Sequence, residues 1–340
     1  MKDDMNTDNV FSRKTILVTG ATGLIGSNLI NALLRLDCAS IIVIGRDANK
    51  MKTVFGKHID EKRLKLIAHD ISNPLPEDLG VVHFVFHAAS PISGKEIGME
   101  PVSVLSANLR GTLNCLDFLV AQKKYAGVSG TFIVFSSATV YGRFFDEETR
   151  IQEHDTSSAD RLDDVQAVYS ESKRMNEVIA LSYMRQFMLD VRIARFAYVY
   201  GDCVIPPKTA FYEFVGLAVQ GKDMVFSGSG FARRDNIYAE DAIVGLLTIC
   251  ERGKPGEAYN VSSGSDGGNF AAIDELADVL AQVAKEDGND VKVVVDRGAK
   301  RKAGMILDNS KLKALGWRIS TSLVDGVRIV YARCKSRYEG

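Results

Sequence analysis

Tyr169 and Lys173 are the side chains in this chain best suited to proton transfer, because they stand four residues apart in a stretch with helical character. Residues i and i+4 of a helix share one face, so the lysine ammonium is expected beside the phenol. A neighbouring positive charge favours the ionised form of a phenol and lowers its pKa from about 10. The pair therefore indicates a proton-transfer site, although a solvent-facing helix can carry the same spacing.

A glycine-rich turn near the start of the chain indicates a second kind of site. The turn, Gly20-Ala-Thr-Gly23-Leu-Ile-Gly26, follows a short apolar run and precedes a stretch with helical spacing. In a dinucleotide site the first glycine permits the tight turn, the second lets the backbone approach a pyrophosphate, and the third lets helix and strand pack closely. The free N–H groups of the helix then face the phosphates. The residues expected to line this site are Gly20, Thr22, Gly23, Leu24, Ile25 and Gly26.

The residues after the second apolar run bear on the choice between NAD and NADP. An acidic residue there would accept hydrogen bonds from the ribose diol and repel a 2′-phosphate. Gly45 takes that place here, and Arg46 follows it. Arg46 suits a 2′-phosphate, or it stacks on adenine while Asp47 reaches the ribose, so NAD and NADP both stay open. The Asp70 carboxylate suits the exocyclic amine of adenine, and the Ile71 side chain suits the face of its ring. The alternative for Asp70 is that it caps a helix.

These sites need a scaffold, and the apolar pattern supplies one. Short apolar runs predict buried strands at 15–19, 41–44, 64–68, 81–86, 131–135 and 191–199, and helical spacing predicts helices at 105–121 and 168–189. Strands that alternate with helices favour an α/β fold with a Rossmann-like, doubly wound parallel sheet.

The pattern changes after Gly201, where a Pro-Pro break precedes a smaller α/β C-terminal substrate lobe. Its expected elements are helices at 209–219, 242–250, 270–285 and 322–333, a strand at 291–295, and a glycine-rich stretch at 221–230. The domain prediction is a flexible arm at 1–13, an NAD(P)-binding Rossmann domain at 14–202, and a substrate lobe at 203–340. Segments at about 237–262 are expected to return to the Rossmann domain.

Composition excludes several classes of function. The chain has 340 residues and a net charge of −1, which provides no field for gripping nucleic acid or an acidic membrane. Its five cysteines show neither CxxC nor zinc-ligand spacing, so no metal is expected and a reduced cytoplasmic setting fits best. The start of the chain lacks the apolar core of a signal peptide, and no apolar run reaches membrane-spanning length.

Taken in chain order, the motifs of this sequence resemble those of extended short-chain dehydrogenases/reductases, and more narrowly the nucleotide-sugar epimerase/dehydratase branch. The early motifs are Gly20–Gly26, His87-Ala-Ala-Ser90, Asn108-Leu-Arg-Gly-Thr112, Ser136-Ser137-Ala-Thr-Val-Tyr-Gly142 and Tyr169-Ser-Glu-Ser-Lys173. The late motifs are Arg195-Phe-Ala-Tyr-Val-Tyr-Gly201, Arg234-Asp-Asn-Ile-Tyr238, Tyr259-Asn-Val261 and Leu315-Gly-Trp317. The resemblance covers nearly the whole chain.

The resemblance implies roles for individual residues. Tyr169 would be the general acid/base, Lys173 would lower its pKa and hold the nicotinamide ribose, and Ser137 would bind the reacting sugar oxygen. Ala88 and Ala89 match the small residues against which the cofactor lies, and Asn108 matches a polar position that supports the lysine through hydrogen bonds. Ser90 is expected at the substrate. His87 ends an apolar run and is interpreted as a packed histidine.

The two residues after Ser137 limit which reactions of this branch the chain is expected to catalyse. Sugar 4,6-dehydratases that resemble this chain carry Asp-Glu where Ala138 and Thr139 stand, and the related decarboxylases carry a glutamate in place of Thr139. Neither alanine nor threonine can exchange protons as those acids do. The segment instead resembles that of sugar 4-epimerases, which oxidise a hydroxyl and return the hydride to the other face of the sugar. Dehydration is therefore disfavoured.

The expected partner is a nucleotide-diphosphate sugar. Arg234 matches the arginine that grips the diphosphate, and its planar guanidinium suits bidentate phosphate binding. Tyr198 stands where many relatives have asparagine, which leaves the sugar and nucleotide open. Relatives commonly form homodimers through the helices that carry Asn108 and the Tyr/Lys pair. The alternatives are an NADP-dependent ketosugar reductase or dehydrogenase and a non-catalytic NAD(P)-binding regulatory protein.

Overall fold

The computed structural model describes residues 9–58, 60–90, 94–142, 149–155, 160–225, 233–294 and 304–339. Three predictions fall partly elsewhere. The first eight residues of the arm, the second half of the glycine-rich stretch at 221–230, and the last residue of the strand at 291–295 lie outside the described residues.

A seven-stranded parallel sheet forms the centre of the larger domain, with strand order β11-β7-β5-β4-β1-β2-β3. Its strands are β1 (Thr15–Thr19), β2 (Ser40–Gly45), β3 (Leu64–Ala68), β4 (Phe84–His87), β5 (Thr131–Ser137), β7 (Asp190–Phe196) and β11 (Ala258–Val261). Most are apolar on both faces, as expected of parallel strands covered by helices on both sides. The predicted Rossmann-like parallel sheet is confirmed.

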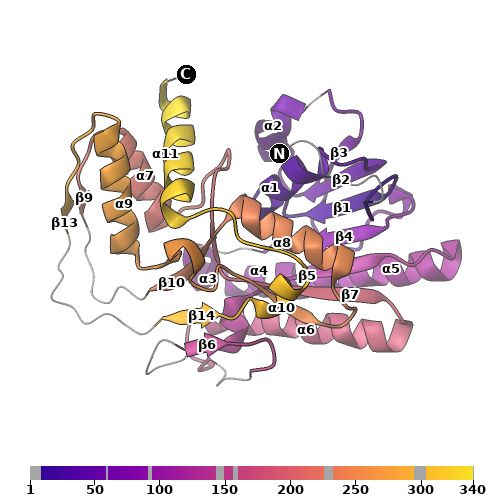
Figure 1. The fold of residues 1–340 in the computed structure, drawn as a ribbon. Helices are drawn as coiled ribbons and strands as arrows, with labels where there is room; N and C mark the ends of the chain where they lie inside the picture. Colours follow the sequence, from indigo (N-terminus) through magenta and orange to yellow (C-terminus); the bar gives the residue numbers. More distant parts are fainter. Residues whose placement is uncertain are drawn as a thin grey trace.

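Two layers of helices cover the sheet. On one face, α1 (Leu24–Leu33), α2 (Ala48–Phe55) and α8 (Ala239–Arg252) enclose a core that includes Leu29, Met51 and Leu246. On the other face, α5 (Gly111–Ala126) and α6 (Ala167–Phe187) enclose a core that includes Cys115 and Ala180. Figure 1 shows α5 and α6 running alongside each other near β5 and β7, with α8 apart from them.

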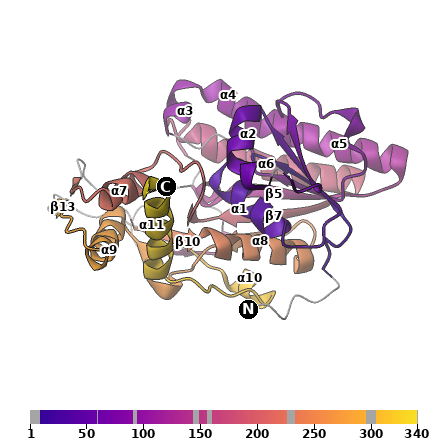
Figure 2. The same cartoon turned by 90° about the horizontal axis from the view of Figure 1, so that it is seen from above.

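A smaller lobe packs three helices together: α7 (Ala210–Val219), α9 (Ile273–Glu286) and α11 (Leu323–Glu339). Beside them lies a two-stranded sheet of β9 (Met224–Val225) and β13 (Val293–Val294). Figures 1 and 2 both show this lobe to one side of the parallel sheet, away from α5.

A second sheet runs between the two parts of the molecule, with order β12-β10-β14-β6 and β8 paired to β10. Its strands are β6 (Thr149–Ile151), β8 (Tyr198–Tyr200), β10 (Arg234–Tyr238), β12 (Phe270–Ala271) and β14 (Met305–Leu307). Because β6 and β8 come from the chain that builds the larger domain, this sheet fixes the smaller lobe relative to it. The short α10 (Ser310–Ala314) follows β14.

The structure differs from the predicted elements at five places. Phe11, inside the predicted arm, is buried against Phe84, so the described residues of that arm pack on the sheet domain. The predicted helix at 105–121 is divided into α4 (Pro101–Leu105), a π-helical turn over Ser106–Arg110, and α5. A break at Ala197 separates β7 from β8, and Phe270 pairs with β10 instead of starting a helix. The helix α3 (Gly94–Met99) was not predicted.

Candidate active site

Strand β5 and helix α6 bring the proton-transfer residues together. Ser137 is the last residue of β5, and a 3₁₀ turn over Ala138–Tyr141 follows it. The Lys173 ammonium on α6 donates to the Phe135 carbonyl on β5 at 2.8 Å and lies 5.8 Å from the centre of the Tyr169 ring. A hydrogen bond joins the hydroxyls of Ser137 and Tyr169. Three predicted catalytic residues, distant in sequence, therefore meet at the carboxyl end of one strand.

Burial controls the charges of this group. Lys173 is only 4% exposed, and burial lowers the pKa of its ammonium to about 8. Burial also raises the pKa of the Tyr169 phenol, against the opposing effect of its hydrogen bond with Ser137. In the protein alone, desolvation therefore outweighs the hydrogen bond from Ser137, and the lowering of the phenol pKa by Lys173 stays a prediction.

A buried ion pair holds α6 against the sheet directly below this group. Glu177 lies one further turn along the helix face of Tyr169 and Lys173, and its carboxylate pairs with Arg195 of β7 at 2.7 Å. The same carboxylate accepts a hydrogen bond of 2.5 Å from Ser136, the neighbour of Ser137. Arg195 also donates to the Tyr141 hydroxyl at 2.9 Å, at the end of the turn after Ser137. The pair thus links the elements that carry Ser137, Tyr169 and Lys173.

Asn108 lies in the π-helical turn before α5 and is fully buried. Its amide donates to the Ser172 hydroxyl at 2.7 Å, and Ser172 donates in turn to the Tyr169 carbonyl at 2.9 Å. The hydrogen bond from Asn108 therefore reaches the residue next to Lys173, whereas the sequence led us to expect support of the lysine itself. π-Helical turns are rare and often occur at functional sites.

His87 is packed, as its place at the end of an apolar run suggested. It is 4% exposed, its Nδ1 lies 2.8 Å from the Thr19 hydroxyl, and its ring stacks near Phe132. Burial, assisted by the charge of Lys173, lowers the pKa of the imidazole to about 3, so the ring is neutral at physiological pH.

The glycine turn leaves an open cradle at the start of α1. Gly20 has φ +66°, and a Cβ there would lie 2.5 Å from the Ala89 nitrogen. A Cβ on Gly26 would lie 2.5 Å from the Gly20 carbonyl oxygen, whereas Gly23 is exposed and has only that oxygen nearby, at 3.5 Å. No side chain caps the N-terminus of α1. Backbone N–H groups at this end are thus available to a phosphate, and Thr22, Leu24 and Ile25 lie in the same turn.

Ala88 and Ala89 follow β4 and lie against this turn. Their backbone nitrogens donate to the Thr19 carbonyl at 3.2 Å and to the Thr19 hydroxyl at 3.3 Å. Ser90 comes next, and its hydroxyl oxygen is buried without a hydrogen-bond partner in the described part of the chain. The side-chain hydroxyl oxygen of Thr139 is also buried and has no hydrogen-bond partner among the described residues. Buried polar atoms of this kind are uncommon, so both are candidates to meet a polar group of a bound molecule.

Four residues predicted at the adenosine end lie beyond β2 and β3. Arg46 and Asp47 are exposed, and Asp47 caps α2 by accepting from the Lys50 nitrogen at 2.9 Å. Asp70 accepts two bonds of 2.9 Å from the backbone and side chain of Ser72, which forms a turn and not a helix cap. These bonds, with a smaller contribution from Arg46, lower the pKa of the Asp70 carboxyl. Ile71 is buried.

Pairing of β8 with β10 brings together the two residues predicted at the substrate. The guanidinium of Arg234 lies over the Tyr198 ring, 5.2 Å from its centre, and Arg234 is exposed. The neighbouring Arg233 is engaged instead with Glu275 at 3.3 Å and with the Phe270 carbonyl at 2.7 Å. Of the two adjacent arginines, Arg234 is therefore the one available to an anion.

The model of the NAD dependent epimerase/dehydratase family matches residues 16–262. The chain belongs to this family. It is 29% identical over 324 residues to UDP-glucuronic acid decarboxylase 6 of Arabidopsis thaliana, across 94% of this chain and 88% of the relative. It is 28% identical over 337 residues to dTDP-D-glucose 4,6-dehydratase of Mus musculus, across 93% of this chain and 87% of the relative.

A solved structure of UDP-glucuronic acid 4-epimerase from Bacillus cereus in complex with NAD is also similar. The TM-score is 0.74 and the identity 25%, across 95% of this chain and 99% of the other. Decarboxylation, dehydration and epimerisation thus all occur among proteins similar to this epimerase/dehydratase family member. The choice among them depends on its own residues.

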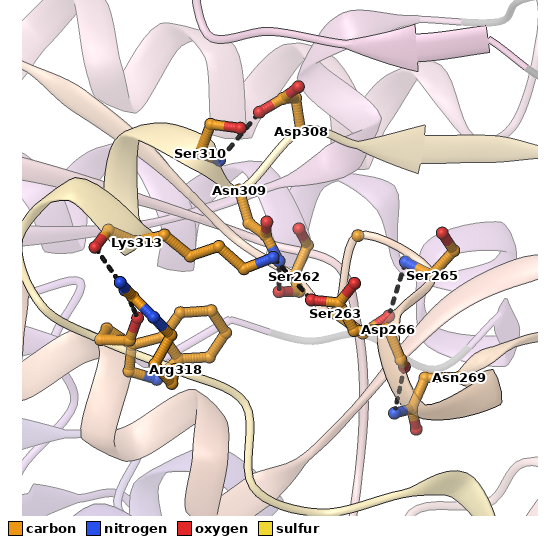
Figure 3. A network of polar contacts seen from close by, with 12 residues as sticks. Ser262, Ser263, Ser265, Asp266, Asn269, Asp308, Asn309, Ser310, Lys313 and Arg318 are labelled. Atoms are coloured by element: carbon orange, nitrogen blue, oxygen red, sulfur yellow. Dashed lines mark hydrogen bonds and ion pairs between the residues drawn. The ribbon is translucent and has the colours of Figure 1, made fainter.

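A polar network anchors the strand that carries Arg234 in this family member. Asp235 of β10 accepts hydrogen bonds from the Ser263 hydroxyl at 2.6 Å and the Leu307 nitrogen at 3.1 Å. Figure 3 shows the adjoining network between the loop after β11 and α10. In it, Asn309 donates to the Ser262 carbonyl at 3.0 Å, and Lys313 pairs with Asp266 at 2.6 Å. The position of Arg234 is therefore tied to the edge of the parallel sheet.

The sequence did not indicate the structural roles of Glu177, Arg195, Ser172 and the Asp235 network. The spacing of Tyr169, Lys173 and Glu177 was a usable signal for the first, because all three share one helix face. Within the described residues, no group of three His, Cys, Asp or Glu side chains is arranged to hold a metal ion. No helix in the same residues is long and apolar enough to cross a membrane.

Proposed function

We propose that this chain is a nucleotide-sugar epimerase of the 4-epimerase type, with Tyr169 as its acid/base. The observation that carries the proposal is the turn after Ser137. It places Ala138 and Thr139 directly after Ser137, whose hydroxyl is hydrogen-bonded to that of Tyr169, at the two positions where, by the resemblance, dehydration and decarboxylation require acids. A group that cannot ionise cannot protonate a leaving hydroxyl or remove a carbon-bound proton.

The residues at the glycine turn fit a nicotinamide dinucleotide. The open face of Gly23 and the uncapped start of α1 suit a pyrophosphate, and Gly20 lies in contact with the Ala88–Ala89 backbone. When bound, the nicotinamide ring supplies the hydride acceptor and donor and, in its oxidised form, a positive charge that favours the phenolate. Asn108, through Ser172, holds the backbone at Tyr169 in place.

Each catalytic residue then has a defined task. Tyr169 takes the proton of a sugar hydroxyl and returns it after the ketosugar has turned. Ser137 holds the same oxygen through the hydroxyl that already contacts Tyr169. Lys173 places a buried positive charge beside the phenol and is positioned by its bond to the Phe135 carbonyl.

The proposed substrate is a nucleotide-diphosphate sugar. Arg234 would bind the diphosphate, with Tyr198 beneath its guanidinium, and Ser90 and Thr139 would offer their unpaired hydroxyls to the sugar. A homodimer through α5 and α6 is part of the proposal. The exposure of Met175 (48%) and Val178 (52%) on α6 supports it, and the sedimentation of Val178→Asp against the wild type would test it.

Arg46 favours a second candidate, a reductase of nucleotide-linked ketosugars that uses exchangeable NADPH. An exposed arginine after β2 suits a cofactor with a 2′-phosphate. This enzyme would use Ser137, Tyr169 and Lys173 in the same way, so only the fate of the hydride separates the two reactions.

The test is to incubate the purified protein with UDP-sugars and follow both sugar and cofactor. Formation of the 4-epimer with no net change in cofactor supports the epimerase. Stoichiometric consumption of added NADPH identifies the reductase, and release of CO₂ or formation of a 4-keto-6-deoxy sugar contradicts the argument from Ala138 and Thr139. Tyr169→Phe should lower kcat by about 10² to 10⁴, the usual contribution of a general acid/base. Undiminished turnover in that variant would exclude Tyr169 as the base.

A further inference from the structure

We infer that this chain selects NADP over NAD, and that Arg46 is the residue that recognises the 2′-phosphate. The inference rests on the proposed dinucleotide site but not on the epimerase reaction. It depends on three observations at the end of β2: the space at Gly45, the engagement of the neighbouring carboxylates, and the availability of Arg46.

Gly45 stands where an NAD site uses an acid, and the space beside it is narrow. A Cβ built on Gly45 would lie 3.1 Å from the sulfur and 3.4 Å from the Cγ of Met51. Met51 is only 1% exposed and belongs to the core beneath α2. A side chain at position 45 would therefore press on Met51, which would have to shift slightly. With glycine at this position, the negative charge that usually repels a 2′-phosphate is absent.

The two nearest carboxylates are already oriented by the backbone. Asp47 uses its Oδ1 to cap α2, through the Lys50 nitrogen at 2.9 Å. Asp70 uses its Oδ1 for both the nitrogen and the hydroxyl of Ser72. Since an N-cap side chain turns back toward its own helix, Asp47 is poorly placed to accept from a ribose diol. The alternative in which Asp47 holds the ribose is thereby weakened.

Arg46, in contrast to these two carboxylates, is not held by hydrogen bonds to any described residue. Its side chain is exposed, and it forms no hydrogen bond or ion pair with any described residue. Asp47 follows it in the chain, and the charge of Arg46 acts on Asp70, which follows β3. A planar guanidinium with free N–H groups is the side chain best matched to a phosphate dianion. Arg46 is thus a donor with no acceptor among the described residues.

This inference departs from the similar structure of UDP-glucuronic acid 4-epimerase from Bacillus cereus, which contains NAD. An arginine stacked on adenine would be compatible with NAD, but stacking would aid NAD and NADP equally. The two roles of Arg46 therefore differ in a measurable way, since only phosphate recognition distinguishes the cofactors.

The experiment is equilibrium titration of the cofactor-free, full-length protein with NADP⁺ and NAD⁺ by calorimetry. We expect NADP⁺ to bind about tenfold to a hundredfold more tightly, the range that follows from hydrogen bonds to a charged group. Arg46→Ala should remove most of that preference while changing the Kd for NAD⁺ less than about threefold. Lys52→Ala, which removes an exposed cation from the other end of α2, is the matched control and should preserve the preference.

Three results would overturn the inference: equal affinities in the wild type, tighter binding of NAD⁺, or a loss of affinity for both cofactors alike in Arg46→Ala. The titration needs no sugar. A failure of the epimerase proposal would leave the NADP preference intact, whereas a protein that binds neither cofactor would refute both.

Discussion

Replacing Lys173 with methionine should make the cofactor-free protein more stable at neutral pH while it abolishes turnover. Lys173 is 4% exposed, and burial moves its pKa from an ordinary 10.5 to about 8. Each pKa unit corresponds to about 1.4 kcal/mol, so keeping the ammonium buried and charged costs about 3 kcal/mol at pH 7. Methionine has a similar length and carries no charge, and it removes this cost.

The hydrogen bond from Lys173 to the Phe135 carbonyl opposes the gain. Its loss costs about 1 to 2 kcal/mol. The net expectation for Lys173→Met is therefore a rise of about 1 to 2 kcal/mol in the free energy of unfolding at pH 7. The residue would then be retained for its chemistry at some expense in stability, as functional groups often are.

The pH dependence of the stability difference between the wild type and Lys173→Met distinguishes the cost of burying the ammonium charge from other effects of the substitution. Between about pH 8 and 10.5 the unfolded chain keeps the proton on Lys173 while the folded protein releases it, so the wild type gains stability as pH rises. At pH 10, burying Lys173 still costs the wild type about 1 kcal/mol of folding free energy. The advantage of Lys173→Met should thus shrink by about 2 kcal/mol between pH 7 and pH 10.

Urea unfolding of both proteins at several pH values measures this difference, with the cofactor removed because a bound ligand would stabilise the folded state. Lys123→Met is the control. Lys123 also donates to backbone carbonyls, those of Phe187 and Met188, but it is half-exposed, so its loss should only destabilise. A wild type more stable than Lys173→Met at pH 7, with a difference that does not change with pH, would refute the reasoning.

The remaining predictions concern the elements that position the site. Glu177→Gln leaves the buried Arg195 without its partner and should lower the free energy of unfolding by about 3 to 5 kcal/mol. The same change at the exposed Glu286, paired with Arg328, should cost less than about 1 kcal/mol in urea unfolding; equal losses would contradict the role of burial. Gly26→Ala places a Cβ 2.5 Å from the Gly20 carbonyl and should weaken dinucleotide binding at least tenfold in calorimetry. Gly56→Ala, which meets nothing within 4 Å, should leave binding unchanged, and an unaffected Gly26→Ala would argue against the cradle.

Local pattern was sufficient for much of the fold. The runs at 15–19 and 64–68 have the same bounds as β1 and β3. β1 lies inside the sheet and is buried beyond its first residue, so it stands out as an apolar run, whereas β3 is an edge strand and only partly buried. The helix at 105–121 was placed less well. Its π-helical turn depends on how Asn108 meets Ser172 on another helix, which no periodicity in the segment records.

The sequence by itself determined which residues have the chemistry: the Tyr169/Lys173 spacing, the glycine turn and the lack of acids after Ser137 are all local. Only the tertiary structure decided how that chemistry is poised. It raised the phenol pKa through burial, and it paired Arg233 with Glu275 while Arg234 stayed available to an anion. Burial and pairing depend on residues far apart in the chain, and a spacing of a few residues cannot report them.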